Sequence, residues 1–167
     1  MRAFEFIYEV LDTTVDVDWS VSGDGGDIGR FEFDGYDYYI SVYPILTESL
    51  FGPQFRVGFE VGFAVKIHDK FVTKSPEGIH QGNKVFSIVY NTIKNKLSNS
   101  DLVLFYADDL DGNLHQRAEL YSKIAKYSRK NYIGRYNNSE TIYCLAVSKH
   151  NLDNNFKQNF YEYMKTL

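Results

Sequence analysis

The stretch DLVLFYADDLDGNLHQRAELYSKIAKYSRKNYIGRY, residues 101–136, decides the fold because its hydrophobic pattern changes twice. Residues 102–107 are apolar on both faces, which is typical of a central strand covered by helices. Residues 114–128 then carry apolar side chains at helical spacing, behind a capping-box pattern that starts at Asn113. The buried stripe of this helix would be Leu114, Ala118, Tyr121, Ala125 and Ser128. Residues 132–136 return to an extended pattern, so the stretch predicts strand, helix and strand.

Before this stretch the chain alternates apolar and polar residues, as half-exposed strands do. The alternation predicts strands at residues 3–10, 30–33, 37–46 and 54–65. In residues 54–65, Val57 and the alternate valines and phenylalanines form the expected core face. Glu60 and its glycine neighbours form a second face, which is predicted to be almost bare.

The hydrophobic period becomes helical after residue 82. Residues 85–97 form a predicted helix behind Asn83 as its N-cap, and residues 141–147 form a further strand. A last amphipathic helix carries Phe156, Phe160, Tyr163 and Leu167. Two long helices around one central strand imply a crossover connection, so part of the sheet should be parallel. We predict one α+β domain over residues 1–167, with a mixed, mainly antiparallel sheet flanked by helices.

The composition is that of a packed globular protein. Hydrophobic residues make up 44% and aromatic residues 17% of the chain, which argues against disorder. The formal charge of -4 gives no footprint for a nucleic-acid backbone, so no nucleic-acid partner is expected. No apolar run approaches the roughly 20 residues of a membrane helix, and the single cysteine, Cys144, cannot form an internal disulfide. We therefore expect a soluble, cytoplasmic protein with no membrane partner.

Several familiar chemistries lack their motifs. The four histidines are scattered, without the spacing that gathers metal ligands, so no metal is expected. The chain also has no phosphate-binding P-loop, dinucleotide-binding glycine motif or GxSxG nucleophile elbow. Asp108 and Asp109 follow the central strand at its carboxyl end, where open α/β sheets place ligands, so they are candidate substrate contacts. The alternative is that they solvate a loop and favour the start of the next helix.

Glu60 is the second candidate for a functional residue. It lies between Gly58 and Gly62 on one strand face, so a ligand could approach a surface with little side-chain cover. A carboxylate in such a groove can have a raised pKa and act as a general base. The alternative is an exposed residue that pairs with Arg56 or Lys66.

The order of predicted elements from residue 55 onward resembles that of GNAT acyltransferases. Their helix after the central strand often has the pattern NxxAxxLYxKxGF, and this chain has Asn113, Ala118 and then LYSK at residues 120–123. The resemblance implies a GNAT-like topology and transfer of an acyl group from acetyl-CoA or another acyl-CoA to an amine. It implies Glu60 as the base and Tyr121 as the acid that protonates the departing thiolate. The alternative for Tyr121 is a core tyrosine of an amphipathic helix.

The resemblance also implies a cofactor-binding loop before the helix of residues 85–97. The residues that would hold acyl-CoA are Gly78, Gly82, Asn83 and Lys84. The GNAT family binds pyrophosphate through a [QR]xxGx[GA] turn, whereas the glycines of KSPEGIHQGNKVF have a different spacing.

The segments VFSIVYNTIKN, LVLFYADD and QRAELYSKIAKY also look similar to small uncharacterised phage-encoded proteins. This likeness implies an alternative function, in which a noncatalytic protein of the same fold binds a host or phage protein. Its role would be host takeover, defence evasion or a place in the virion, and its location would be the host cytoplasm or the virion. The sequence leaves a homo-oligomer open.

Overall fold

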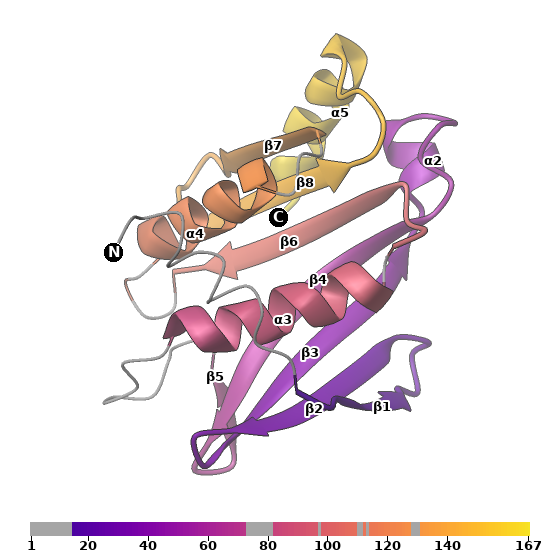
Figure 1. The fold of residues 1–167 in the computed structure, drawn as a ribbon. Coiled ribbons are helices and arrows are strands. Elements are labelled where there is room, and N and C mark those ends of the chain that lie inside the picture. The colour runs from indigo at the N-terminus through magenta and orange to yellow at the C-terminus, as the bar shows by residue number, and fades with distance from the viewer. Residues whose placement is uncertain (1–14, 73–81, 97, 110–111, 113, 128–130) are drawn as a thin grey trace. The chain divides into compact units, whose positions relative to one another are not determined.

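A computed structural model describes residues 15–72, 82–96, 98–109, 112, 114–127 and 131–167. Within these residues the chain forms a mixed, mostly antiparallel sheet and four helices (Figure 1). The predicted α+β class is confirmed at this level. The strand predicted at residues 3–10 lies outside the described residues.

The strands are β1 (Asp18–Val21), β2 (Asp27–Phe33), β3 (Tyr36–Ile45), β4 (Gly58–Ile67), β5 (Lys70–Val72), β6 (Leu102–Asp108), β7 (Asn131–Tyr136) and β8 (Ile142–Ser148). The helices are α2 (Thr47–Phe51), α3 (Gly82–Lys96), α4 (Leu114–Tyr127) and α5 (Asn154–Met164). The strand order is β1-β2-β3-β4-β6-β8-β7, and β5 pairs with β4. The elements predicted after residue 82 are confirmed, except that α5 ends at Met164 and does not include Leu167. Strands β1 and β5 and helix α2 were not predicted.

The chain divides into two compact units. Met1–Ser41 and Phe63–Ser98 belong to the first unit, and Val42–Gly62 and Asn99–Leu167 belong to the second. Strands β3 and β4 have residues in both units. The sequence-based prediction of a single domain stays a prediction.

Aromatic rings from the strands of the first unit stack on one another. The ring of Tyr38 lies 5.2 Å from that of Phe31 and 5.8 Å from that of Phe63, with both pairs nearly parallel. The β4–β5 hairpin of this unit turns at His68 and Asp69, which have positive φ angles of 47° and 63°. Sequence analysis missed β5 because its turn contains no glycine or proline to mark it.

The sheet of the second unit is built around β6. Gly58–Val61 of β4 pair in parallel with Leu102–Phe105 of β6, so the predicted crossover and partly parallel sheet are confirmed. On its other side β6 pairs antiparallel with β8, and β8 pairs antiparallel with β7.

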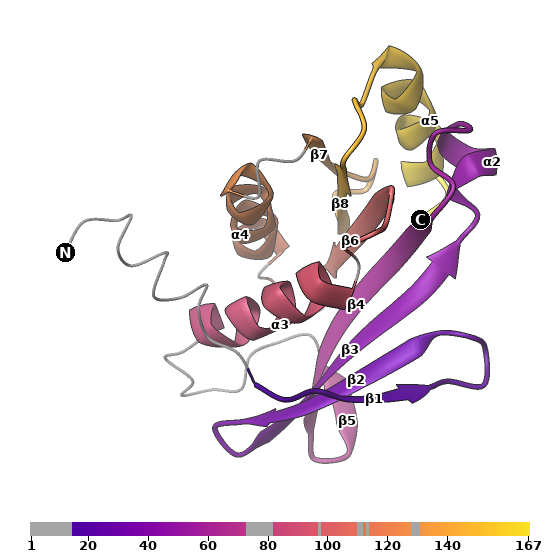
Figure 2. The same cartoon turned by 45° about the vertical axis from the view of Figure 1, so that its right-hand side comes forward.

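Helices cover both faces of this second sheet, and Figure 2 shows α4 and α5 on opposite sides of β6 and β8. The core on the α5 and α2 side contains the buried residues Phe51, Phe55, Leu102, Leu104, Cys144, Ala146, Leu152, Phe156, Phe160 and Met164. The core on the α4 side contains the buried residues Ala107, Leu114, Ala118, Ala125, Tyr143 and Leu145. The predicted α4 stripe is therefore confirmed at Leu114, Ala118 and Ala125, while Ser128 lies outside the described residues.

The faces of β4 differ from their prediction. Val61 is buried as expected, but Val57 is 45% exposed because β4 begins only after it, at Gly58. The opposite face is covered, since Gly58 is buried beneath Thr47 and Glu60 is half-buried. The prediction of an almost bare face is therefore wrong.

The helix starts show how local hydrogen bonding sets element boundaries. Helix α3 begins at Gly82, so Asn83 lies in the first turn and is not the predicted N-cap. Helix α5 begins after Asp153, whose Oδ1 accepts the N–H of Phe156 at 2.8 Å. This bond satisfies one of the N–H groups that a helix start leaves unpaired.

Replacing Gly58 by alanine should destabilise the protein, because the added Cβ would collide with the Thr47 side chain. Overpacking of this kind costs about 1–3 kcal/mol of unfolding free energy. Gly23→Ala is the matched control, since a Cβ there has no atom within 4 Å. Urea unfolding of both variants measures the difference, and equal stability of the two would contradict the contact.

Candidate functional site

Glu60, the predicted base, lies on β4 opposite Leu104 of β6. Paired residues of neighbouring strands project to the same face, so Glu60 belongs to the face that α5 covers. Gly58 and Gly62 flank it on that face, as predicted. Glu60 is half-buried, and burial raises the pKa of its carboxyl group above the usual range. Its carboxylate therefore binds a proton more tightly than an exposed glutamate does.

Two tyrosines and a cysteine form a polar cluster near Glu60. The hydroxyls of Tyr106 on β6 and Tyr163 on α5 are hydrogen-bonded to each other, and Cys144 on β8 is the cross-strand partner of Tyr106. Burial is the main cause of the raised pKa of all three groups, and the Glu60 carboxylate raises each of them further. Glu60 therefore shares its face with neutral hydroxyl and thiol groups that sequence analysis did not assign to a site.

Tyr121, the predicted acid, lies on α4 and packs on the other face of the sheet. Its ring centroid is 6.1 Å from that of Phe105, and it packs against the buried cluster under α4. Burial raises the pKa of its hydroxyl to about 12, while Arg117 lowers this pKa and Asp108 raises it. These surroundings are those of a packed tyrosine.

The structure does not bring Glu60 and Tyr121 together. Strand β6 presents Leu104 on the Glu60 side and Phe105 on the Tyr121 side. Because alternate residues of a strand point to opposite faces, the sheet itself lies between the two side chains. The prediction that they line one cleft is therefore wrong, although the chemical role of each residue stays a prediction.

Asp108 and Asp109, the predicted substrate contacts, lie at the carboxyl end of β6. Arg117 of α4 donates to the main-chain carbonyl of Asp108, and its guanidinium is 3.8 Å from the Asp108 carboxylate. The N–H of Asp109 donates to the carbonyl of Thr141 at 3.0 Å, and its side chain is exposed. Asp108 thus holds the start of α4 near the sheet, on the side of Tyr121.

The predicted cofactor-binding residues are described only in part. Gly78 lies outside the described residues, and Gly82, Asn83 and Lys84 form the first turn of α3. Lys84 is exposed. These three residues belong to the first unit, whereas Glu60 belongs to the second.

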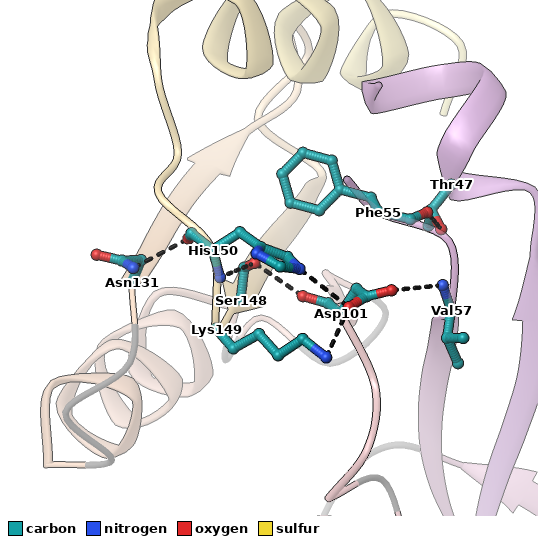
Figure 3. Close-up of polar contacts among 8 residues, drawn as sticks. All are labelled: Thr47, Phe55, Val57, Asp101, Asn131, Ser148, Lys149 and His150. Carbon is teal, nitrogen blue, oxygen red and sulfur yellow. Dashed lines mark hydrogen bonds and ion pairs between the residues drawn. The ribbon is translucent and has the colours of Figure 1, made fainter. Parts of the chain in front are cut away.

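A polar network centred on Asp101, which the sequence did not predict, lies in the second unit (Figure 3). The Asp101 side chain is only 11% exposed. Its Oδ1 accepts hydrogen bonds from Lys149 Nζ at 2.7 Å and from His150 Nε2 at 3.0 Å. Its Oδ2 accepts the main-chain N–H of Val57 at 2.9 Å. Lys149, then Val57 and His150, hold the pKa of Asp101 well below its usual range, although burial acts in the opposite direction.

Ser148 and Asn131 complete this network. Ser148 Oγ donates to the carbonyl of Asp101 at 2.8 Å and accepts the N–H of His150 at 2.9 Å. Asn131 Nδ2 donates to the carbonyl of His150 at 2.9 Å. The Ser148 hydroxyl is thus bonded to main-chain groups and not to the His150 ring, which differs from a nucleophile activated by a base. The network joins the starts of β4, β6 and β7 to the end of β8.

A signal for this network was present in the sequence. Asp101 comes directly before the buried strand 102–107, and Lys149 and His150 follow the strand 141–147. In an antiparallel pair the start of one strand meets the end of the other. Pairing those two strands would have placed the acid beside the two basic residues, but the pairing itself was not predictable from one sequence.

A scan against protein-family models and a search of curated proteins found no match to this chain. Among the described residues, no group of three or more His, Cys, Asp or Glu side chains is placed to hold a metal ion. Over the same residues, no helix has the length and apolar character needed to cross a membrane.

Asp101→Asn should lower the free energy of unfolding by about 2 kcal/mol at neutral pH, because it weakens hydrogen bonds to a buried acceptor. The folded state lowers the pKa of Asp101, so this carboxylate stabilises the protein above its unfolded pKa, about 3.9. That stabilisation is lost as the pH falls through the lowered folded value. Urea unfolding between pH 7 and pH 3 should show the deficit of the variant shrinking below about pH 4.

Ser148→Ala is the control for this experiment, because it removes a neutral hydrogen bond to the same residue. Its deficit should stay constant over the same pH range. A deficit of Asp101→Asn that is equally independent of pH would contradict the ionic role of Asp101.

Glu60→Gln should leave the fold intact and stabilise it at neutral pH. The folded state raises the pKa of Glu60, so the ionised carboxylate destabilises the fold above its unfolded pKa, about 4.3. The gain of the variant should therefore disappear as the pH falls below about 4. Thermal unfolding against pH measures it, with Glu32→Gln at an exposed position as the control. A loss of stability at neutral pH would indicate that Glu60 makes a structural ion pair instead.

Proposed function

We propose that this chain is a divergent GNAT-like domain that transfers an acyl group from acyl-CoA to an amine, with Glu60 as the general base. The observation that carries the proposal is the half-buried Glu60 carboxylate, whose pKa is raised by burial, on the parallel-paired strand β4. The parallel pair β4–β6 around a crossover, with β8 antiparallel to β6, supports the same reading of the fold.

The environment of Glu60 suits proton abstraction from an amine. A general base works best when its pKa lies near the working pH, and burial moves a glutamate in that direction. The ionised carboxylate also attracts a cationic amine, because it lies on a face whose other polar groups, Tyr106, Tyr163 and Cys144, are neutral. The substrate class that follows is an amine that is cationic in solution.

In the proposed reaction the bound ammonium group first loses one proton to water. Glu60 then takes a proton from the neutral amine as its nitrogen attacks the thioester carbonyl. A carbon–nitrogen bond forms, the carbon–sulfur bond breaks, and the bonding electron pair leaves with the sulfur. The proton held by Glu60 then passes through water to the thiolate, which restores the carboxylate. Tyr121 has no part in this sequence, since it packs on the opposite face.

The first turn of α3 has the chemical groups that bind phosphate. The first N–H groups of a helix lack partners within the helix and attract anions. Gly82, Asn83 and Lys84 form this turn, and Lys84 adds a cationic side chain. We propose this turn of the first unit as a phosphate contact, independently of the Glu60 site of the second unit.

A noncatalytic protein-binding domain of the same fold is the second candidate function. Two observations favour it: Glu60 and Tyr121 lie on opposite faces, and apolar side chains are exposed at α2. Leu46 is 81% exposed and Leu50, one helical turn later, is 42% exposed. On this alternative the partner would be a host or phage protein.

Thermal unfolding with acetyl-CoA and release of the coenzyme A thiol with a panel of amines test the leading proposal. Acetyl-CoA should raise the unfolding temperature of the wild type and of Glu60→Gln alike, because selective binding to the folded state stabilises it. Glu60→Gln should reduce turnover by about 10²-fold or more. Tyr121→Phe should leave turnover nearly unchanged.

The absence of any thermal shift at millimolar acetyl-CoA would contradict acyl transfer. A large loss of turnover in Tyr121→Phe would contradict the assignment of the site to the Glu60 face. Copurification of one specific protein, lost on Leu46→Asp together with Leu50→Asp, would support the binding alternative.

A further inference from the structure

The start of β4 is held at two consecutive residues, which Figure 3 shows in part. Oδ2 of Asp101 accepts the N–H of Val57 at 2.9 Å. The carbonyl of Val57 accepts the N–H groups of Asp101 at 2.7 Å and of Leu102 at 3.2 Å. At the next residue, Gly58, the strand passes beneath the side chain of Thr47. Both contacts fix the position of β4 along its neighbours.

The contact with Thr47 accepts only a glycine. A Cβ at Gly58 would overlap the Thr47 side chain, whose Oγ1 donates to the carbonyl of Phe55 at 2.5 Å and is buried. The neighbours of Gly58 are Val57 and Phe59, and neither fits in that space. A shift of β4 by one residue in either direction therefore costs a steric clash at this point, and the bond from Asp101 to Val57 adds to that cost.

The register has a direct consequence for Glu60. The parallel pairing comprises four residue pairs, Gly58–Val61 with Leu102–Phe105. A slip of one residue turns every side chain of a strand to the opposite face. It would move Glu60 away from Tyr106 and to the face of Tyr121. A pairing this short depends on the contacts at its end.

We propose that Asp101 is a positioning residue for Glu60. Its bond to Val57, together with Thr47 over Gly58, forms a register lock that keeps Glu60 on the α5 face. The inference rests on the proposed function, because the role of Glu60 as a base gives the register its chemical consequence.

The two carboxylate oxygens of Asp101 have different partners, so its contact with β4 can be tested separately from its ion pairs. Oδ2 faces the N–H of Val57, whereas Oδ1 accepts from Lys149 and His150 at the end of β8. Ser148 Oγ, in contrast, donates to the main-chain carbonyl of Asp101 and not to its carboxylate. Variants of Lys149 and Ser148 therefore disturb the network without removing the bond to β4.

Nuclear magnetic resonance on the ligand-free protein tests the register lock. The readouts are the cross-strand contacts between Glu60 and Leu104, and the titration of the Glu60 carboxyl carbon. Asp101→Ala should lose these contacts and lower the midpoint of the Glu60 titration toward its usual value, about 4.3. Asp101→Asn should restore both, because the amide oxygen can still accept the N–H of Val57. Lys149→Met and Ser148→Ala should leave both unchanged.

Two results would overturn the proposal. The first is that Asp101→Ala keeps the cross-strand contacts and the Glu60 titration of the wild type. The second is that Ser148→Ala changes both readouts as much as Asp101→Ala does, which would show a general loosening of the network. If Asp101→Ala does not fold, hydrogen exchange of the unaltered protein decides. The Val57 amide should then exchange as slowly as the amides inside β4, and rapid exchange would overturn the register lock.

This experiment is independent of acyl transfer because it uses no acyl-CoA. A register lock without an acetyl-CoA thermal shift would leave Asp101 in its structural role and remove the proposed reaction. A thermal shift without a register lock would remove the positioning role alone.

Discussion

The parallel pairing of β4 with β6 is the constraint on which the second unit depends. It comprises four residue pairs, and β8 and then β7 extend the sheet from the other edge of β6. Parallel pairing is slightly less stable per residue than antiparallel pairing and needs a long crossover, so a short parallel ladder gains from anchors at its end. Asp101 and Thr47 supply such anchors, and both act on the first residues of the ladder.

The two faces of this sheet have different chemical characters. The α5 face combines a large aromatic cluster with Glu60 and the hydrogen-bonded pair Tyr106 and Tyr163. On the α4 face the Asp108 carboxylate is paired with Arg117, and neutral hydroxyl groups bond to one another, as Ser122 does with Tyr143 at 2.7 Å. A carboxylate beside neutral groups can exchange a proton with a ligand, whereas a hydroxyl pair packed under a helix mainly fixes side-chain positions. This contrast is the reason for placing the proposed chemistry on the α5 face.

The sequence predicted those elements whose signals are local. Residues 102–107 are apolar throughout, and the helical spacing of Leu114, Ala118 and Ala125 survives in the buried side of α4. Helix α2 has five residues, too few for a hydrophobic period to emerge, and β1 is a four-residue strand. Short elements of this kind are fixed by tertiary contacts more than by their own sequence.

The candidate site depended on information that a single sequence lacks. The glycines around Glu60 were visible, yet the face to which Glu60 points relative to Tyr121 depends on the register of β4 against β6. A shift of one residue in that register would place Glu60 on the opposite face of the sheet. The bond between Val57 and Asp101 joins residues 44 positions apart in the sequence, so no local pattern predicts it. Residue types could be predicted here, but their grouping could not.

The reactivity of Cys144 can report how often the core of the second unit opens. It is the single cysteine of the chain, it is fully buried, and burial raises the pKa of its thiol. Thiol reagents attack the thiolate, so both its burial and its protonated state protect the folded protein from alkylation. Modification of this sulfur therefore requires the core between the sheet and α5 to open. The rate of labelling measures how often this opening occurs. The chain thus carries a native labelling site that reports on the opening of one core, with no engineered cysteine.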